Sequence, residues 1–213
     1  MEIKWLDDFA KSWQDRVAHG RVPHAVLLAG PPGVGKRAAA RWMAASTLGL
    51  EVSALPTHPG APPEHADLRW IAPPEDKEAI GIEQIRNLVN HMSLTSYEGG
   101  GKVAVIEPAN AMTVNAANSL LKTLEEPPPR NVFILNVRDP GDLFPTIVSR
   151  CQRVPFKPLA TEHIADFLTH EEHVDAERAR LVARLAEGSL GRAQWLATDE
   201  LFEERAHWLA RLR

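Results

Sequence analysis

A glycine-rich segment early in the chain has the residue types of a phosphate-binding loop. Gly30, Gly33, Gly35 and Lys36 lie in the run Gly30-Pro-Pro-Gly-Val-Gly-Lys36, which has the spacing G-x-x-x-x-G-K. The backbone N–H groups of such a loop converge on an anion, and the lysine at its end reaches the terminal phosphates. The spacing therefore predicts a nucleotide site at these residues.

The residues that would complete a hydrolytic site depart from the pattern. Arg37 stands where a Ser or Thr hydroxyl normally holds Mg²⁺, and Pro108 stands beside Glu107 where a carboxylate would polarise water. Glu107 could still approach a metal, but a missing general base costs about 10²- to 10⁴-fold in rate. We therefore expect negligible hydrolysis by this chain. Two alternatives stay open: an ATPase in its own right, and a module that binds ATP or ADP with Mg²⁺ without hydrolysing it.

The elements that position these residues alternate along the chain. Short apolar runs predict strands, and amphipathic segments between them predict helices, with Thr113 as an N-cap and Pro155 marking an edge strand. The alternation predicts an α/β fold with a mostly parallel, five-stranded sheet. The strands are expected at 24–29, 68–72, 103–106, 132–135 and 152–156, and the helices at 4–19, 37–48, about 82–92 and 113–126.

The strand signals end near Pro158. The segments 161–170, 175–187 and 189–213 are predicted as helices, so we expect a P-loop core domain over 1–158 and a small helical domain over 159–213. The proline-rich stretch 49–67 is expected to be a surface loop. Its two histidines, His58 and His65, are expected to be solvated, because a structural zinc site needs four ligands.

The composition excludes several classes of protein. With 213 residues, 44% hydrophobic and 24% charged, the chain is typical of a globular protein. Charged residues within the first ten positions argue against a signal peptide, and no apolar run is long enough to span a membrane, so we expect a cytoplasmic protein. The single cysteine, Cys151, excludes an internal disulfide. A net charge of −4 argues against a stand-alone nucleic-acid binder.

Three segments resemble the clamp-loader branch of the AAA+ ATPases. They are Gly30 to Lys36, the run Ala116-Ala-Asn-Ser-Leu-Leu-Lys-Thr-Leu-Glu-Glu-Pro-Pro128, and the run Thr146-Ile-Val-Ser-Arg-Cys151. The resemblance implies a AAA+ core followed by a helical lid, in a subunit of a ring-like pentamer that places a sliding clamp on primed DNA in replication. The implied partners are ATPase subunits of the gamma and tau type and a delta-type subunit of the DNA polymerase III assembly, together with the clamp and DNA, and no membrane.

The resemblance also implies a role for Arg150. In that family, the arginine of Ser-Arg-Cys projects across a subunit interface to a neighbour's ATP, so Arg150 is expected to be an arginine finger that acts in trans. A guanidinium fixed in this way neutralises charge that develops on the transferred phosphoryl group. The leading hypothesis is therefore an accessory, non-hydrolysing clamp-loader subunit. Cys151 is expected to be a small buried residue without chemistry.

Several positions depart from the family pattern. The polar sensor expected after the fourth strand lies among Asn136, Val137 and Arg138, and the sequence does not fix its register. Gly191, with Arg192 one residue later, occupies the position where active subunits carry a second sensor, an arginine. A cysteine-based zinc module of related subunits is replaced by the proline-rich loop, so no metal is expected. A helical collar domain is expected beyond the end of this chain.

Overall fold

The computed structural model describes residues 4–50, 64–97 and 99–198. Contacts between residues divide the chain into two compact units. We call the first the sheet unit, which comprises 5–30 and 36–156. The second, the helical unit, includes 31–35 and the described residues from 157 onward. The domain boundary placed at residue 158 by the sequence stays a prediction.

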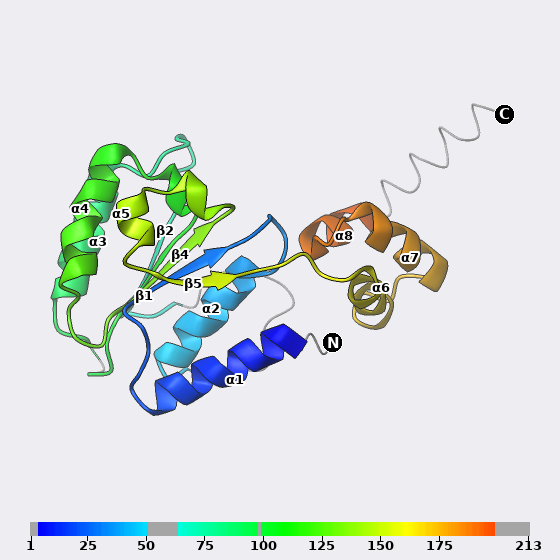
Figure 1. The fold of residues 1–213 in the computed structure, drawn as a ribbon, viewed down its shortest axis with the longest axis horizontal. Helices are drawn as coiled ribbons and strands as arrows, with labels where there is room; N and C mark the ends of the chain where they lie inside the picture. The colour runs from blue at the N-terminus through cyan, green and yellow to red at the C-terminus, as the bar shows by residue number, and fades with distance from the viewer. Residues whose placement is uncertain (1–3, 51–63, 98, 199–213) are drawn as a thin grey trace. The chain divides into compact units, whose positions relative to one another are not determined.

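The sheet unit is built on five parallel strands in the order β2-β3-β4-β1-β5. The predicted five-stranded parallel sheet is therefore confirmed, and the strand that contains Pro155 lies at an edge (Figure 1). The strands are β1 Ala25–Ala29, β2 Leu68–Ile71, β3 Val103–Ile106, β4 Val132–Val137 and β5 Gln152–Pro155.

Helices cover both faces of this sheet. Helices α3, α4 and α5 lie on one face, and α1 and α2 lie on the other (Figure 1). Thr113 is the N-cap of α4, as predicted, because its side chain accepts a hydrogen bond from Ala116 N at 3.2 Å. The helices are α1 Lys4–Ala18, α2 Lys36–Thr47, α3 Ile82–Ser93, α4 Val114–Glu125 and α5 Pro145–Val148, with short 3₁₀ turns at Ala109–Ala111 and Pro140–Asp142.

The central strands are buried on both faces. Alternate residues of β1 and β4 pack against α3, α4 and α5, and the residues between them are buried as well. Continuous apolar runs are what strands covered by helices on both sides require. The side chains on the α3 to α5 face include Leu27, Ala104, Ile106, Phe133 and Leu135.

The helical unit contains three helices in its described part. Helices α6 Thr161–His170 and α7 Ala176–Leu185 confirm the predicted segments. The helix expected over 189–213 is interrupted in the described part of the chain, where α8 Leu190–Leu196 ends with Ala197 as its C-cap. Residues 199–213 lie outside the described part of the chain.

Two further expectations concern the proline-rich stretch. Residues 51–63, and His58 with them, lie outside the described part of the chain. His65 is not fully solvated as expected, because it is half-buried and its Nδ1 accepts a hydrogen bond from Asp67 N at 3.0 Å. Among the described residues, no three His, Cys, Asp or Glu side chains are grouped to hold a metal. The described helices are all too short or too polar to cross a membrane.

Candidate functional site

The two ends of the glycine-rich loop belong to the sheet unit. Gly30 follows β1 and Lys36 begins α2, and the Lys36 ammonium donates a hydrogen bond to the Gly30 carbonyl at 2.5 Å. Burial lowers the pKa of Lys36, and the nearby Glu107 carboxylate opposes that shift. A Cβ atom at Gly30 would lie 2.1 Å from the Phe156 carbonyl oxygen, so the close approach of the chain after β5 requires a glycine here.

The middle of the loop belongs to the helical unit. Gly33 and Gly35 have positive φ angles of 75° and 96°, and the Gly33 carbonyl accepts a hydrogen bond from Gly191 N at 3.0 Å. A Cβ atom at Gly33 would lie 2.1 Å from the Ser189 hydroxyl, and one at Gly191 would lie 3.3 Å from Gly33 Cα. The missing side chain at Gly191 thus lets the start of α8 contact the loop backbone.

Arg37 and Glu107 form an ion pair in the sheet unit. Arg37 Nε lies 3.3 Å from Glu107 Oε2, and the guanidinium carbon lies 5.9 Å from the centre of the Trp70 ring. Mg²⁺ requires oxygen ligands, whereas a guanidinium offers only donors and carries its own positive charge. The residues present therefore do not fit a Mg²⁺ site, because the carboxylate that could bind the metal already faces a cation of the same chain.

Of the three candidates for the sensor after β4, Asn136 is the buried polar one. Its exposed fraction is 2%, Val137 packs in the apolar core, and Arg138 is exposed. Among the described residues, neither amide atom of Asn136 has a hydrogen-bond partner. The register of β3 with β4 places Asn136 beside Glu107, whose Oε2 is buried and paired with Arg37. The structure thus brings Lys36, Glu107 and Asn136 to the carboxyl ends of neighbouring strands.

Arg150 lies at the opposite end of the sheet. It lies two residues before the start of β5, whereas Lys36 follows the carboxyl end of β1, and these two strands are parallel neighbours. The Arg150 guanidinium donates to the Thr146 carbonyl at 2.7 Å and to Glu125 Oε1 at 2.5 Å, and 33% of the side chain is exposed. The structure therefore does not bring Arg150 together with the glycine-rich loop.

Cys151 is half-buried against the apolar core of the sheet unit. Burial raises the pKa of its thiol to about 12. The thiolate is the reactive form of cysteine, so this side chain is protonated and unreactive near neutral pH.

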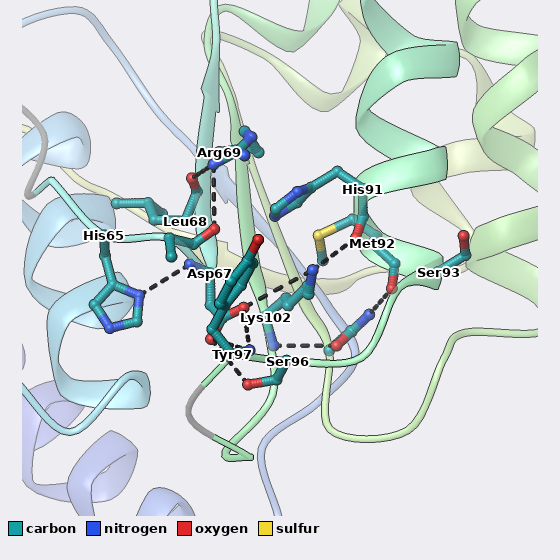
Figure 2. Close-up of polar contacts among 12 residues, drawn as sticks. His65, Asp67, Leu68, Arg69, His91, Met92, Ser93, Ser96, Tyr97 and Lys102 are labelled. Atoms are coloured by element: carbon teal, nitrogen blue, oxygen red, sulfur yellow. Dashed lines mark hydrogen bonds and ion pairs between the residues drawn. The ribbon is translucent and has the colours of Figure 1, made fainter.

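A buried polar cluster, which the sequence did not indicate, lies at the amino-terminal ends of β2 and β3 (Figure 2). We define it as Asp67, His91, Ser96, Lys102 and Asn131. Asp67 and Lys102 have exposed fractions of 0% and 1%, and Lys102 Nζ lies 3.8 Å from Asp67 Oδ1. The only signal in the sequence is that each of these two charged residues directly precedes an apolar strand.

Hydrogen bonds satisfy most of the remaining polar atoms of this cluster. Asp67 accepts hydrogen bonds from the Ser96 hydroxyl at 2.9 Å and from Tyr97 N at 2.9 and 3.0 Å. Lys102 Nζ donates to the His91 carbonyl at 2.9 Å, and Asn131 links Lys102 N to the Met92 carbonyl. The cluster therefore fastens the end of α3 and the following loop to two strands, which is a structural role.

Lowering the pH below about 6.5 is expected to weaken the fold through His91. Burial lowers the pKa of His91, with the Arg69 and Lys102 cations next in importance, and Asp67 opposes them. Because the unfolded chain then binds more protons than the folded one, this contribution to stability is present above pH 6.5 and is lost as the pH falls through the lowered pKa. In urea unfolding measured as a function of pH, the free energy of unfolding should fall less steeply at acid pH for His91→Gln than for the wild type. An equal fall in the two proteins would contradict this assignment.

Comparisons with known proteins show which family the chain resembles. The model of the family described as DNA polymerase III, delta subunit, matches residues 5–160. The delta' subunit of DNA polymerase III from Pseudomonas aeruginosa is 37% identical over 212 residues, which cover 91% of this chain and 62% of that protein. The tau subunit from Escherichia coli is 37% identical over 181 residues, covering 80% of this chain and 28% of that protein. The chain thus spans about three fifths of the length of the delta' relative.

A solved structure shows the same fold. The RuvB Holliday junction branch migration motor of Thermotoga maritima superposes with a TM-score of 0.66 at 17% identity, covering 92% of this chain and 61% of that one. The likeness confirms the predicted α/β fold. Because the matched segment 5–160 covers most of the sequence, the chain belongs to the DNA polymerase III delta-subunit family.

Proposed function

We propose that the chain is an accessory, delta'-type subunit of a clamp loader that does not hydrolyse ATP itself and offers Arg150 to ATP bound by a neighbouring subunit. Its partners are ATPase subunits of the gamma and tau type and a delta-type subunit in a hetero-pentamer, and through them the sliding clamp and primed DNA in the cytoplasm. The similarity to both a delta' and a tau subunit over most of the chain supports this proposal.

The main support for this proposal is the position of Arg150. The guanidinium and the glycine-rich loop lie at opposite ends of parallel neighbouring strands. Arg150 therefore cannot contact a nucleotide bound by the loop of its own chain. The guanidinium is partly exposed, so a phosphoryl group of another subunit can reach it. At the loop itself, Arg37 faces Glu107 and Pro108 supplies no base, which supports a chain that contributes to hydrolysis without performing it.

The test is a reconstituted clamp loader with its ATPase subunits, in which Arg150 is replaced by alanine in this chain alone. Loss of DNA-stimulated ATP turnover and of clamp loading supports the proposal, and unchanged turnover overturns it. The rival, an ATPase in its own right, predicts phosphate release by the isolated chain that disappears in Lys36→Ala.

A second candidate function is nucleotide binding without hydrolysis. The buried, unpartnered amide of Asn136 beside Glu107 favours it, because a ligand could satisfy that amide. In this case the binding is expected not to depend on Mg²⁺, since the residues present do not fit the metal.

Replacing Arg37 by threonine is expected to make nucleotide affinity depend on Mg²⁺. The substitution removes the cation that faces Glu107 and supplies the hydroxyl that the loop pattern normally carries. Interactions with charged groups are worth about 1.5–3 kcal/mol, so Mg²⁺ should raise the affinity of the variant about tenfold or more. Calorimetry with ADP, with and without Mg²⁺, measures this, with Arg37→Thr/Lys36→Ala as the control. A wild-type affinity that already rises tenfold with Mg²⁺ would contradict it.

A further inference from the structure

Arg150 is paired within its own chain by a carboxylate that the motif Ser149-Arg-Cys151 does not contain. Its Nη2 donates to Glu125 Oε1 at 2.5 Å, and its Nη1 donates to the Thr146 carbonyl at 2.7 Å. Both terminal nitrogens of the guanidinium therefore already have acceptors. Glu125 is the last residue of α4, and Thr146 lies in α5.

The backbones that carry this pair are fixed by burial. Leu120 and Leu124 of α4 and Ile147 and Val148 of α5 all belong to the apolar core of the sheet unit. The two helices lie next to each other on the same face of the sheet (Figure 1). Glu125 therefore stands at a defined place beside the finger, and its position does not depend on a flexible loop.

The side chains of the pair, in contrast, reach solvent. The exposed fractions are 33% for the Arg150 side chain and 49% for that of Glu125. Ion pairs at such exposure are weak, because water and salt screen them. The pair can therefore open at little cost.

A carboxylate and a phosphoryl group both accept hydrogen bonds from a guanidinium. Both bind its planar fork of N–H donors, and the phosphoryl group carries more negative charge. While Glu125 accepts a hydrogen bond from Nη2 and balances the positive charge of the guanidinium, Arg150 binds an oxygen of another subunit's nucleotide less strongly. Glu125 and an incoming phosphoryl group thus compete for one guanidinium.

We propose that Glu125 is a releasable internal counter-ion of Arg150. It holds the guanidinium while no partner nucleotide is aligned with it and releases it when a phosphoryl group arrives, and the Thr146 carbonyl retains the side chain at Nη1. The proposal rests on the trans role of Arg150 proposed above. It assigns to Glu125 a positioning role that restrains ATP turnover until the partner site is assembled.

The experiment compares Glu125→Gln with Glu126→Gln in the reconstituted clamp loader. Glutamine removes the charge of Glu125 and keeps its shape, and Glu126 is an adjacent exposed carboxylate that no hydrogen bond or ion pair of the described residues joins to Arg150. Glu125→Gln is expected to raise the ATP turnover measured without clamp and DNA about two- to fivefold, which corresponds to the strength of one exposed ion pair. Turnover in the presence of clamp and DNA should stay near the wild-type value, and Glu126→Gln should match the wild type in both conditions.

Two further variants separate the possible failures. Glu125→Gln/Arg150→Ala should behave as Arg150→Ala alone, and thermal unfolding of Glu125→Gln should match that of Glu126→Gln, because the effect acts through the finger and not through folding. Suppose that Arg150→Ala abolishes the stimulation of ATP turnover, but that the turnover of Glu125→Gln equals that of Glu126→Gln or is slower than that of the wild type. The counter-ion role of Glu125 is then wrong, and the trans role of Arg150 is retained. If Arg150→Ala leaves turnover unchanged, the proposed function itself fails.

Discussion

Alanine at Arg150 is expected to lower DNA-stimulated ATP turnover at the neighbouring site of a reconstituted clamp loader by about 100-fold or more. Arginine fingers are worth about 10³- to 10⁵-fold in the GTPases that depend on them most, and residues of the ATPase subunit retain part of the catalysis here. The guanidinium meets charge that develops only in the transition state, so kcat should fall more than KM rises. Single-turnover hydrolysis with the variant in this chain alone measures the effect.

Lysine at the same position provides the matched control for Arg150. Arg150→Lys keeps the positive charge but loses the planar fork that reaches both Thr146 and Glu125. We therefore expect a turnover between those of the wild type and of Arg150→Ala. If Arg150→Lys were as slow as Arg150→Ala, the geometry of the fork would matter more than its charge. Turnover of the alanine variant within twofold of the wild type would contradict the trans role altogether.

Methionine at Lys102 is expected to destabilise the fold by about 3–5 kcal/mol, which is the usual cost of removing one partner from a buried ion pair. Lys102 and Asp67 are both fully buried, and the substitution removes the ammonium that lies 3.8 Å from the Asp67 carboxylate. For a chain of this length, such a loss lowers the melting temperature by about 6–20 °C. Urea unfolding at neutral pH measures the free energy directly.

The control for this substitution is Lys122→Met, at an exposed lysine in the last turn of α4. Its effect should stay within about 0.5 kcal/mol, as is usual for surface positions. Asp67→Asn/Lys102→Met should be less destabilised than the sum of its single substitutions, because the double variant removes the charges of both partners of the pair. A loss in Lys102→Met no larger than that in Lys122→Met would contradict a structural role of the buried polar cluster.

Much of the sheet unit follows from local patterns. The continuous apolar runs at β1, β3 and β4 predict strands covered on both faces, and Thr113 predicts the start of α4. The four-residue helix α5 was not predicted, since one turn is too short to show helical periodicity. The end of α8 at Leu196 was not predicted, because the hydrophobic spacing in the sequence continues beyond this residue.

The candidate site was predictable only where a motif fixes the spacing. Lys36, Arg37 and Glu107 follow from the loop pattern and the end of a strand, and the structure joins the last two in an ion pair. The partnership of Arg150 with Glu125 was not predictable, because it depends on the packing of α4 against α5 across 25 positions of sequence. The register of Asn136 likewise required the alignment of β4 with β3.

The strand order has a consequence for synthesis on the ribosome. The central strand β1 pairs with β4 and β5, and Ala25 is aligned with Phe133, more than 100 residues later in the chain. At translation rates of roughly 5–20 residues per second, the nascent apolar segment waits roughly 5–20 s before its neighbour emerges. Until then it has no sheet to join, so ribosome-bound chains that stop before β4 should be preferred clients of chaperones and ready targets of proteases.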